Sequence, residues 1–296
     1  MRKQWSICVG AGALTALLLC GATSGVAQSG QQGGQSQPAP QQQPPPAGTE
    51  KDKQPNPAPL SMDNAPAPPT PEEEAASKAV QQATDPSKKI QLAEDFLQKY
   101  PQSRYRPTMY QALVSGYFAT QQVPKMLEAG EKEVEINPND APVLAVMGQA
   151  LARTYNAKAP DAAKQLDKAE LYSKRAIEIT PTLPKPENLT DEAFNNAKND
   201  TLVMAHSGLG LVYIRRGKFS EAIPELEQSV KGDTHPDPDP VNYYLLGVAD
   251  KQTSHFEAAA AAFSKCAAVP STLQAACKSS AEDAKKQGSS QLSAPN

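Results

Sequence analysis

The sequence has few aromatic residues and no surplus of positive charge. Phe, Trp and Tyr make up 5% of its 296 residues, and 29 Lys and Arg stand against 32 Asp and Glu. Proteins that bind nucleic acid usually carry clustered Lys and Arg in excess, so this balance argues against a nucleic-acid partner. The single tryptophan, Trp5, lies in a segment that we expect to be removed.

Motifs for catalysis, metal binding and nucleotide binding are also missing. The sequence has no CxxC or HExxH pattern, and its three histidines are far apart. Gly208 and Gly210 lack the third glycine of a nucleotide-binding loop. The carboxylates between 233 and 239 lack the glycine and the closing acid of a calcium loop. We therefore expect a chain without enzyme activity, cofactor or metal.

The first 27 residues are typical of a bacterial export signal. Arg2 and Lys3 supply positive charge, and an apolar stretch follows from 7 to 19. This stretch is short for a membrane span, and the residues at 25–27 are the small ones that signal peptidase recognises. We predict cleavage before Gln28.

Two alternative interpretations attach the chain to a membrane through this segment alone. In the first, the signal stays uncleaved as an anchor. In the second, the run from Leu17 to Cys20 acts as a lipobox, although Leu19 stands where a small residue is needed. The chain leaves the cytoplasm under each interpretation, so we predict a periplasmic or cell-envelope location in a bacterium.

Residues 28–70 form a low-complexity segment of Gln, Pro, Gly, Ala and Ser. Such a segment has too little apolar surface to offset the conformational entropy lost on folding. We expect a disordered Pro/Gln-rich arm that acts as a tether.

Helical periodicity begins after this arm. Thr70, Pro71 and Glu73 provide a helix cap, a first-turn proline and a capping-box acid. Alanine-rich sequence with apolar residues at a spacing near 3.6 continues to about residue 287. Ser254 and Glu257 predict a second capping box further along.

The helical region repeats itself. Gly210 is followed twelve residues later by Ala222, and Gly247 stands in the same relation to Ala259. Small residues at these places let two antiparallel helices approach closely, while a proline at the end of each unit sets the turn into the next pair. One such pair buries too little surface alone, so several pairs must stack to make a core.

The segments Leu209 to Ala222 and Val134 to Ala141 strongly resemble tetratricopeptide repeats (TPRs). The resemblance implies an all-α solenoid of four to five helix pairs over residues 71–287. Its units lie at about 71–104, 107–140, 141–181, 203–236 and 240–273, and the first is the weakest. We expect a capping helix at 272–287 and a disordered tail at 288–296.

In this family the first helix of each pair lines a groove that grips ligands. Helix phase assigns to the groove Gln111, Ser115, Gln149, Arg153, Ser207, Leu211, Arg215, Tyr244, Val248 and Lys251. This polar set with three cations suits an extended or acidic peptide, and a solvated face without a strong ligand is the alternative.

The resemblance implies a non-catalytic scaffold or adaptor that binds proteins or peptides in the cell envelope. Two other functions stay open. The chain could be a substrate-holding subunit of an envelope enzyme complex, or a self-associating structural component.

Cys266 and Cys277 are the two cysteines that remain after signal removal. The turn near Pro270 lies midway between them, so antiparallel helices would bring them to the same level. An oxidising compartment then favours a structural disulfide. Alternatives are a small packing residue at Cys266 and a redox-active pair.

Overall fold

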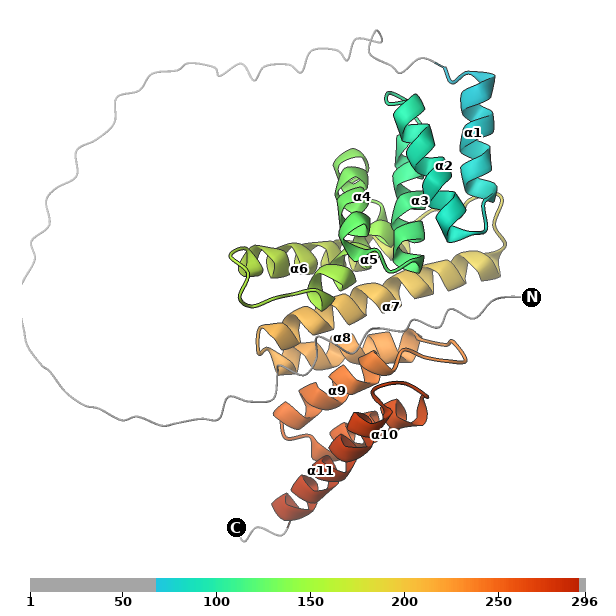
Figure 1. Ribbon diagram of the computed structural model, residues 1–296. Helices are drawn as coiled ribbons and strands as arrows, with labels where there is room; N and C mark the ends of the chain where they lie inside the picture. Colours follow the sequence, from blue (N-terminus) through green and yellow to red (C-terminus); the bar gives the residue numbers. More distant parts are fainter. Residues whose placement is uncertain (1–67, 293–296) are drawn as a thin grey trace, which may run out of the picture. The chain divides into compact units, whose positions relative to one another are not determined.

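The computed structural model describes residues 68–292, and every regular element in that range is a helix (Figure 1). The predicted signal and nearly all of the predicted arm lie outside the described residues. The helices are α1 (Pro71–Gln82), α2 (Pro86–Lys99), α3 (Arg106–Ala119), α4 (Val123–Ile136), α5 (Ala141–Arg153), α6 (Ala162–Ile179), α7 (Asp191–Arg215), α8 (Phe219–Gly232), α9 (Pro240–Gln252), α10 (Phe256–Ala268) and α11 (Gln274–Leu292), with a 3-10 turn η2 (Thr180–Thr182) after α6. None of these helices is both long enough and apolar enough to cross a membrane.

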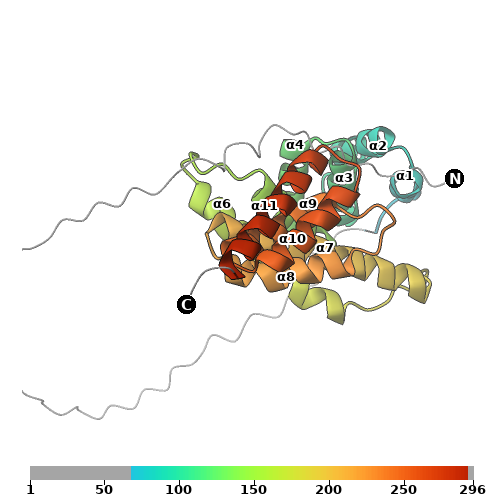
Figure 2. The same ribbon diagram turned by 90° about the horizontal axis from the view of Figure 1, so that it is seen from below.

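Each helix packs on the next one along the chain, which makes five pairs from α1/α2 to α9/α10 and a final helix, α11 (Figures 1 and 2). The pairs join through second-to-first helix contacts such as α2 with α3 and α8 with α9, and α5 also packs broadly on α7. The prediction of an all-α stack of helix pairs is confirmed.

Local caps set the starts of several helices. The side chain of Thr70 accepts a hydrogen bond from the Glu73 backbone N–H at 3.2 Å, and Pro71 occupies the first turn of α1. Thr190 caps the long helix α7 in the same way, through the N–H of Ala193. Such caps satisfy backbone donors that have no partner inside the helix.

One predicted cap is wrong, and the reason is the geometry that ends the first helix of a pair. Ser254 has a φ of 64°, Gln121 has 59° and Gly217 has 70°. These residues occupy the same place in their units, directly after the C-cap of the first helix. Ser254 therefore belongs to the left-handed turn that closes α9, and α10 begins at Phe256 without a side-chain cap.

The repeated glycines lie where two helices approach most closely. A Cβ atom added at Gly210 on α7 would lie 2.6 Å from Cγ of Leu226 on α8. One added at Gly247 on α9 would lie 2.7 Å from Cδ1 of Phe263 on α10. These contacts explain the glycine in the repeat, because a larger residue would push the pair apart.

The core follows the stack instead of forming a single centre. A large apolar cluster extends from Val80 on α1 to Ala262 on α10. A second, smaller cluster joins α10 to α11 through Phe263 and Ala284. This is the continuous interior that stacked helix pairs need.

The last helix is longer than predicted. Helix α11 reaches Leu292, so residues 288–292 of the predicted tail belong to this helix. Gly288 lies near Phe256, at the start of α10, which gives this last turn a surface to pack on. A disulfide joins Cys266 on α10 to Cys277 on α11, with their Cα atoms 5.8 Å apart.

Candidate interaction surface

Three of the ten predicted groove residues lie inside the stack. Gln149, Ser207 and Leu211 are buried, with exposed fractions of 7%, 1% and 6%. Helix α5 packs broadly on α7, which covers the faces that carry these side chains. The prediction that they face a partner is therefore wrong, because contact between successive first helices uses this surface.

The buried polar residues form a hydrogen-bonded ladder between three units. Gln149 on α5 donates through Nε2 to the hydroxyl of Ser207 on α7 at 3.1 Å. Ser207 in turn donates to Oδ1 of Asn242 on α9 at 2.6 Å. Because a buried polar group is costly when it has no partner, this ladder favours one relative position of the three helices.

The three predicted groove cations are engaged within the chain. Arg153 forms an ion pair with Asp239 at 2.7 Å, and Lys251 pairs with Asp283 on α11. Arg215 lies over the ring of Tyr155, 5.7 Å from its centroid, and burial lowers the pKa of its guanidinium. The attraction that these cations would offer to an acidic peptide is correspondingly reduced.

The other groove residues stay at least partly accessible. Gln111 and Ser115 on α3 are exposed, although Gln111 Nε2 also donates to Asp140. Tyr244 and Val248 on α9 are half-buried against the cluster that contains Phe263. The accessible part of the predicted groove is therefore divided between α3 and the helices near the C-terminal end.

A buried carboxyl pair is the polar feature that sequence reasoning missed. Glu133, in the last turn of α4, is fully buried, and Asp140, the N-cap of α5, is 7% exposed. Within residues 68–292, neither carboxyl oxygen of Glu133 has a hydrogen-bond partner. Burial, followed by the neighbouring Asp140 carboxylate, raises the pKa of Glu133 to about 8.

The repeat register contains the signal that could have revealed this pair. Glu133 lies seven residues after buried Met126, just as Ala176 follows Ala169 and Ser229 follows Ala222. Cys266 follows Ala259 at the same spacing and is also buried. A glutamate at the place of a small, buried residue marks a departure from the packing rule of the other units.

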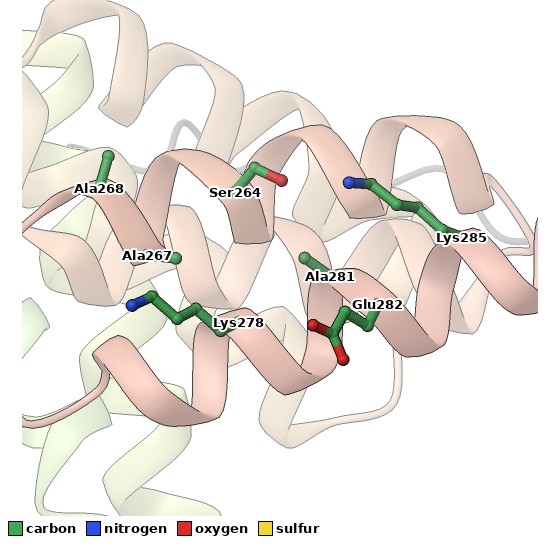
Figure 3. A pocket seen from close by; sticks show the side chains of 7 residues that line it. All are labelled: Ser264, Ala267, Ala268, Lys278, Ala281, Glu282 and Lys285. Atoms are coloured by element: carbon green, nitrogen blue, oxygen red, sulfur yellow. The ribbon is translucent and has the colours of Figure 1, made fainter.

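Two hollows of the described part lie at the C-terminal end. One lies between α10 and α11, where side chains from the two helices face a common space (Figure 3). Its lining includes small residues such as Ala267 and Ala281 beside charged Lys278, Glu282 and Lys285. It is wide open to solvent. It therefore suits contact with a protein segment better than the binding of a small molecule, which needs a more enclosed pocket.

Among residues 68–292 no group of three or more His, Cys, Asp or Glu side chains is arranged to hold a metal ion. Each histidine lies near a carboxylate instead, as in the pair of His206 Nδ1 and Glu225 at 2.7 Å.

The chain is similar to known proteins in three-dimensional structure only. No protein-family model and no curated protein matches the sequence. A thermophilic TPR protein in Thermus thermophilus is 18% identical, with a TM-score of 0.44 over 74% of this chain and 98% of its own. A MamA RS-1 ArsTM double mutant is 14% identical, with a TM-score of 0.44 over 75% of this chain and 96% of its own.

A tetratricopeptide repeat protein from Parabacteroides merdae is 13% identical, with a TM-score of 0.28 over 72% of this chain and 98% of its own. The helix pairs, glycine contacts and shared turns of this chain make up a TPR-like α-solenoid fold.

Proposed function

We propose that the chain is a non-catalytic scaffold or adaptor that binds other proteins or peptides in the bacterial cell envelope. The observation that carries this proposal is the stack of five helix pairs, which presents a long series of helix faces and turns. Stacked repeats of this kind provide extended binding surfaces, whereas each separate pair is too small to hold a partner firmly.

The envelope location rests on the sequence of the first 27 residues and on the cysteine pair. Export would place Cys266 and Cys277 in an oxidising compartment, where a disulfide persists. The partner would be a protein segment, because the hollow between α10 and α11 is open and does not enclose a small molecule.

Affinity capture from an envelope fraction tests the proposal. The full exported chain is the bait, and we expect a defined set of protein partners at reproducible stoichiometry. Recovery of the chain alone in self-assemblies would contradict the adaptor function and favour a structural component. A single enzyme recovered as the stoichiometric partner would favour the accessory-subunit function.

Two matched serine variants locate the binding surface. Ser115 on α3 and Ser264 on α10 are both exposed, and each hydroxyl donates to a backbone carbonyl of its own helix. Ser115→Arg alters the α3 part of the predicted groove, and Ser264→Arg alters the hollow between α10 and α11. We expect Ser115→Arg to reduce capture by about tenfold or more. Loss with Ser264→Arg alone would move the binding surface to the C-terminal hollow.

A further inference from the structure

The junction between α4 and α5 differs from the other junctions of the stack. Helix α4 makes sparse contact with α5, and α3 does not pack broadly on α5, whereas α5 packs broadly on both α6 and α7. The first two helix pairs are therefore attached to the other three through a narrow contact. One apolar element of this contact is Gly130, where an added Cβ would lie 2.2 Å from Sδ of Met147.

Polar links supplement this small apolar contact. Glu131 on α4 accepts hydrogen bonds from Lys168 at 2.9 Å and from the Tyr172 hydroxyl at 3.1 Å, both on α6. Arg175 on α6 donates to Asn139 at 2.7 Å. Most of these groups are at least partly exposed, so their bonds contribute little and are exchanged readily for water.

The buried pair Glu133 and Asp140 lies within this junction, one residue on each side of the turn that joins the helices. Asp140 is held by two donors: the Val143 backbone N–H at 3.1 Å and Nε2 of Gln111 on α3. The side chains of Asn137 and Gln111 also face Glu133, but they lower its pKa less than burial and Asp140 raise it. A second negative charge beside Asp140 would therefore be buried without a cation from the described part of the chain to compensate it.

Among the described residues, no basic side chain neutralises the pair. From α3 the facing group is Gln111, from the end of α4 it is Asn137, and from α5 it is Asp140. On α6, Arg175 bonds Asn139 and Glu178 instead. On α4 itself Lys132 and Glu135 are exposed. Binding of a proton by the carboxyl pair is therefore the way in which its second negative charge is removed.

We propose that the α4–α5 junction is a proton-controlled hinge, closed while Glu133 and Asp140 share one negative charge and loosened when both are ionised. The hinge would change the position of the first two helix pairs relative to the other three. The proposal concerns a motion of the chain itself and holds whether or not the surface binds a partner.

The direction of the pH effect follows from the closed junction binding the proton more tightly. The pKa of Glu133 is raised from an ordinary value of 4.5 to about 8 when it is buried beside Asp140. Opening returns the carboxyl to water and releases the proton above pH 4.5. The closed form is therefore fully favoured below about pH 4.5 and is lost as pH rises towards about 8. The opening equilibrium increases by up to about tenfold per pH unit in this window.

Amide hydrogen exchange on the full exported chain at pH 5 and pH 8 tests the hinge. Rates are corrected for the pH dependence of unprotected amides, and peptides from 123–153 are compared with reference peptides from 86–99, which lie away from Asp250. We expect protection at the junction to fall by about tenfold or more from pH 5 to pH 8, while the reference peptides keep theirs. Equal protection at the junction at both pH values would overturn the proposal, as would a parallel loss in the reference peptides.

Two substitutions separate Glu133 from other titrating groups. Glu133→Gln keeps the shape of the side chain and cannot ionise, so its junction should stay protected at pH 8. Glu135→Gln, on the exposed face of the same helix, is the matched control and should behave as the wild type does. Loss of junction protection in Glu133→Gln equal to that of the wild type would also overturn the proposal. If the glutamine variant fails to fold, Glu133→Ala replaces it in the same test, because alanine occupies the equivalent position 176.

Discussion

At the scale of single residues, a close approach between the backbones of two units depends on Gly208. An added Cβ there would lie 2.9 Å from the backbone nitrogen of Gln149 and 3.0 Å from its Cα. Backbone atoms of a neighbouring helix cannot turn aside as a flexible side chain does, so two whole units would have to separate. The contact lies beside Ser207 and the polar ladder, which the same displacement would disturb.

We therefore predict that Gly208→Ala lowers the free energy of unfolding by roughly 1–3 kcal/mol, although alanine is normally the better helix former. Chemical denaturation followed by circular dichroism measures the change. Gly288→Ala is the control, because a Cβ at that helical glycine would meet only Cβ of Phe256, at 3.3 Å. A stabilised Gly208→Ala would show that α5 and α7 are less closely packed than described.

A second residue-scale prediction concerns Asp250, which is 5% exposed near the end of α9. Burial raises its pKa from 3.8 to about 6, and the charge of His255 partly opposes this rise. The folded state therefore binds the proton more tightly, and the resulting stability is present below pH 3.8 and lost as pH rises to about 6.

Asp250→Asn should remove this dependence. At pH 7 we expect the variant to melt at a higher temperature than the wild type, with a gain of about 1–3 kcal/mol. At pH 4 the two should melt at similar temperatures. Comparing variant with wild type at each pH cancels the contribution of other groups, including Glu133. A variant less stable than the wild type at pH 7 would contradict the pKa shift.

At the scale of elements, the C-terminal helix packs broadly on one neighbour, α10. Helix α11 contacts α10 through Phe263, Ala281 and Ala284, and the disulfide between Cys266 and Cys277 fixes the same face. Lys251 on α9 adds an ion pair with Asp283. The covalent link therefore restricts a terminal element that packs mainly on a single helix.

We predict that removing the disulfide costs about 3 kcal/mol, the loop-entropy value for a bond between residues this close in sequence. The measurement compares the melting temperature of the exported protein with that of Cys266→Ala/Cys277→Ala, since alanine fits the small-residue place of Cys266. Non-reducing mass spectrometry supplies the control by testing the linkage itself. Two alkylatable thiols in the exported protein would refute the bond.

At the scale of the whole molecule, the repeats divide into two sets that meet at α4 and α5. Arg216 links α7 to the preceding pair through Asp167 at 2.6 Å and through Glu170. Arg153 reaches from α5 to Asp239, at the start of α9. Such links join the later pairs more firmly to one another than to the first two.

Export makes a further prediction for the whole chain. Trp5 is the single tryptophan of the sequence, so cleavage before Gln28 would leave none. Protein purified from the periplasm should then show no tryptophan fluorescence when it is excited at the red edge of the aromatic absorption band. A cytoplasmic preparation of the uncleaved chain is the positive control. Tryptophan emission from the periplasmic protein would mean that the N-terminal segment is retained.

The sequence determined the helical class, the repeat units and many helix ends, because these depend on local spacing. Thr70 and Thr190 cap helices within three residues, and the glycines at 148, 210 and 247 face the next helix along the chain. The position of Ser254 in a left-handed turn was not evident, because serine and glutamate at that spacing also fit a capping box.

The tertiary structure alone decided which helix faces are covered. Helix phase shows that Gln149, Ser207 and Leu211 share a face with the other groove residues. Their burial depends on how far α7 rotates and slides against α5, and that displacement is set by contacts between units. The burial of Glu133 beside Asp140 is also decided by tertiary structure, because it depends on how α4 packs at the start of α5.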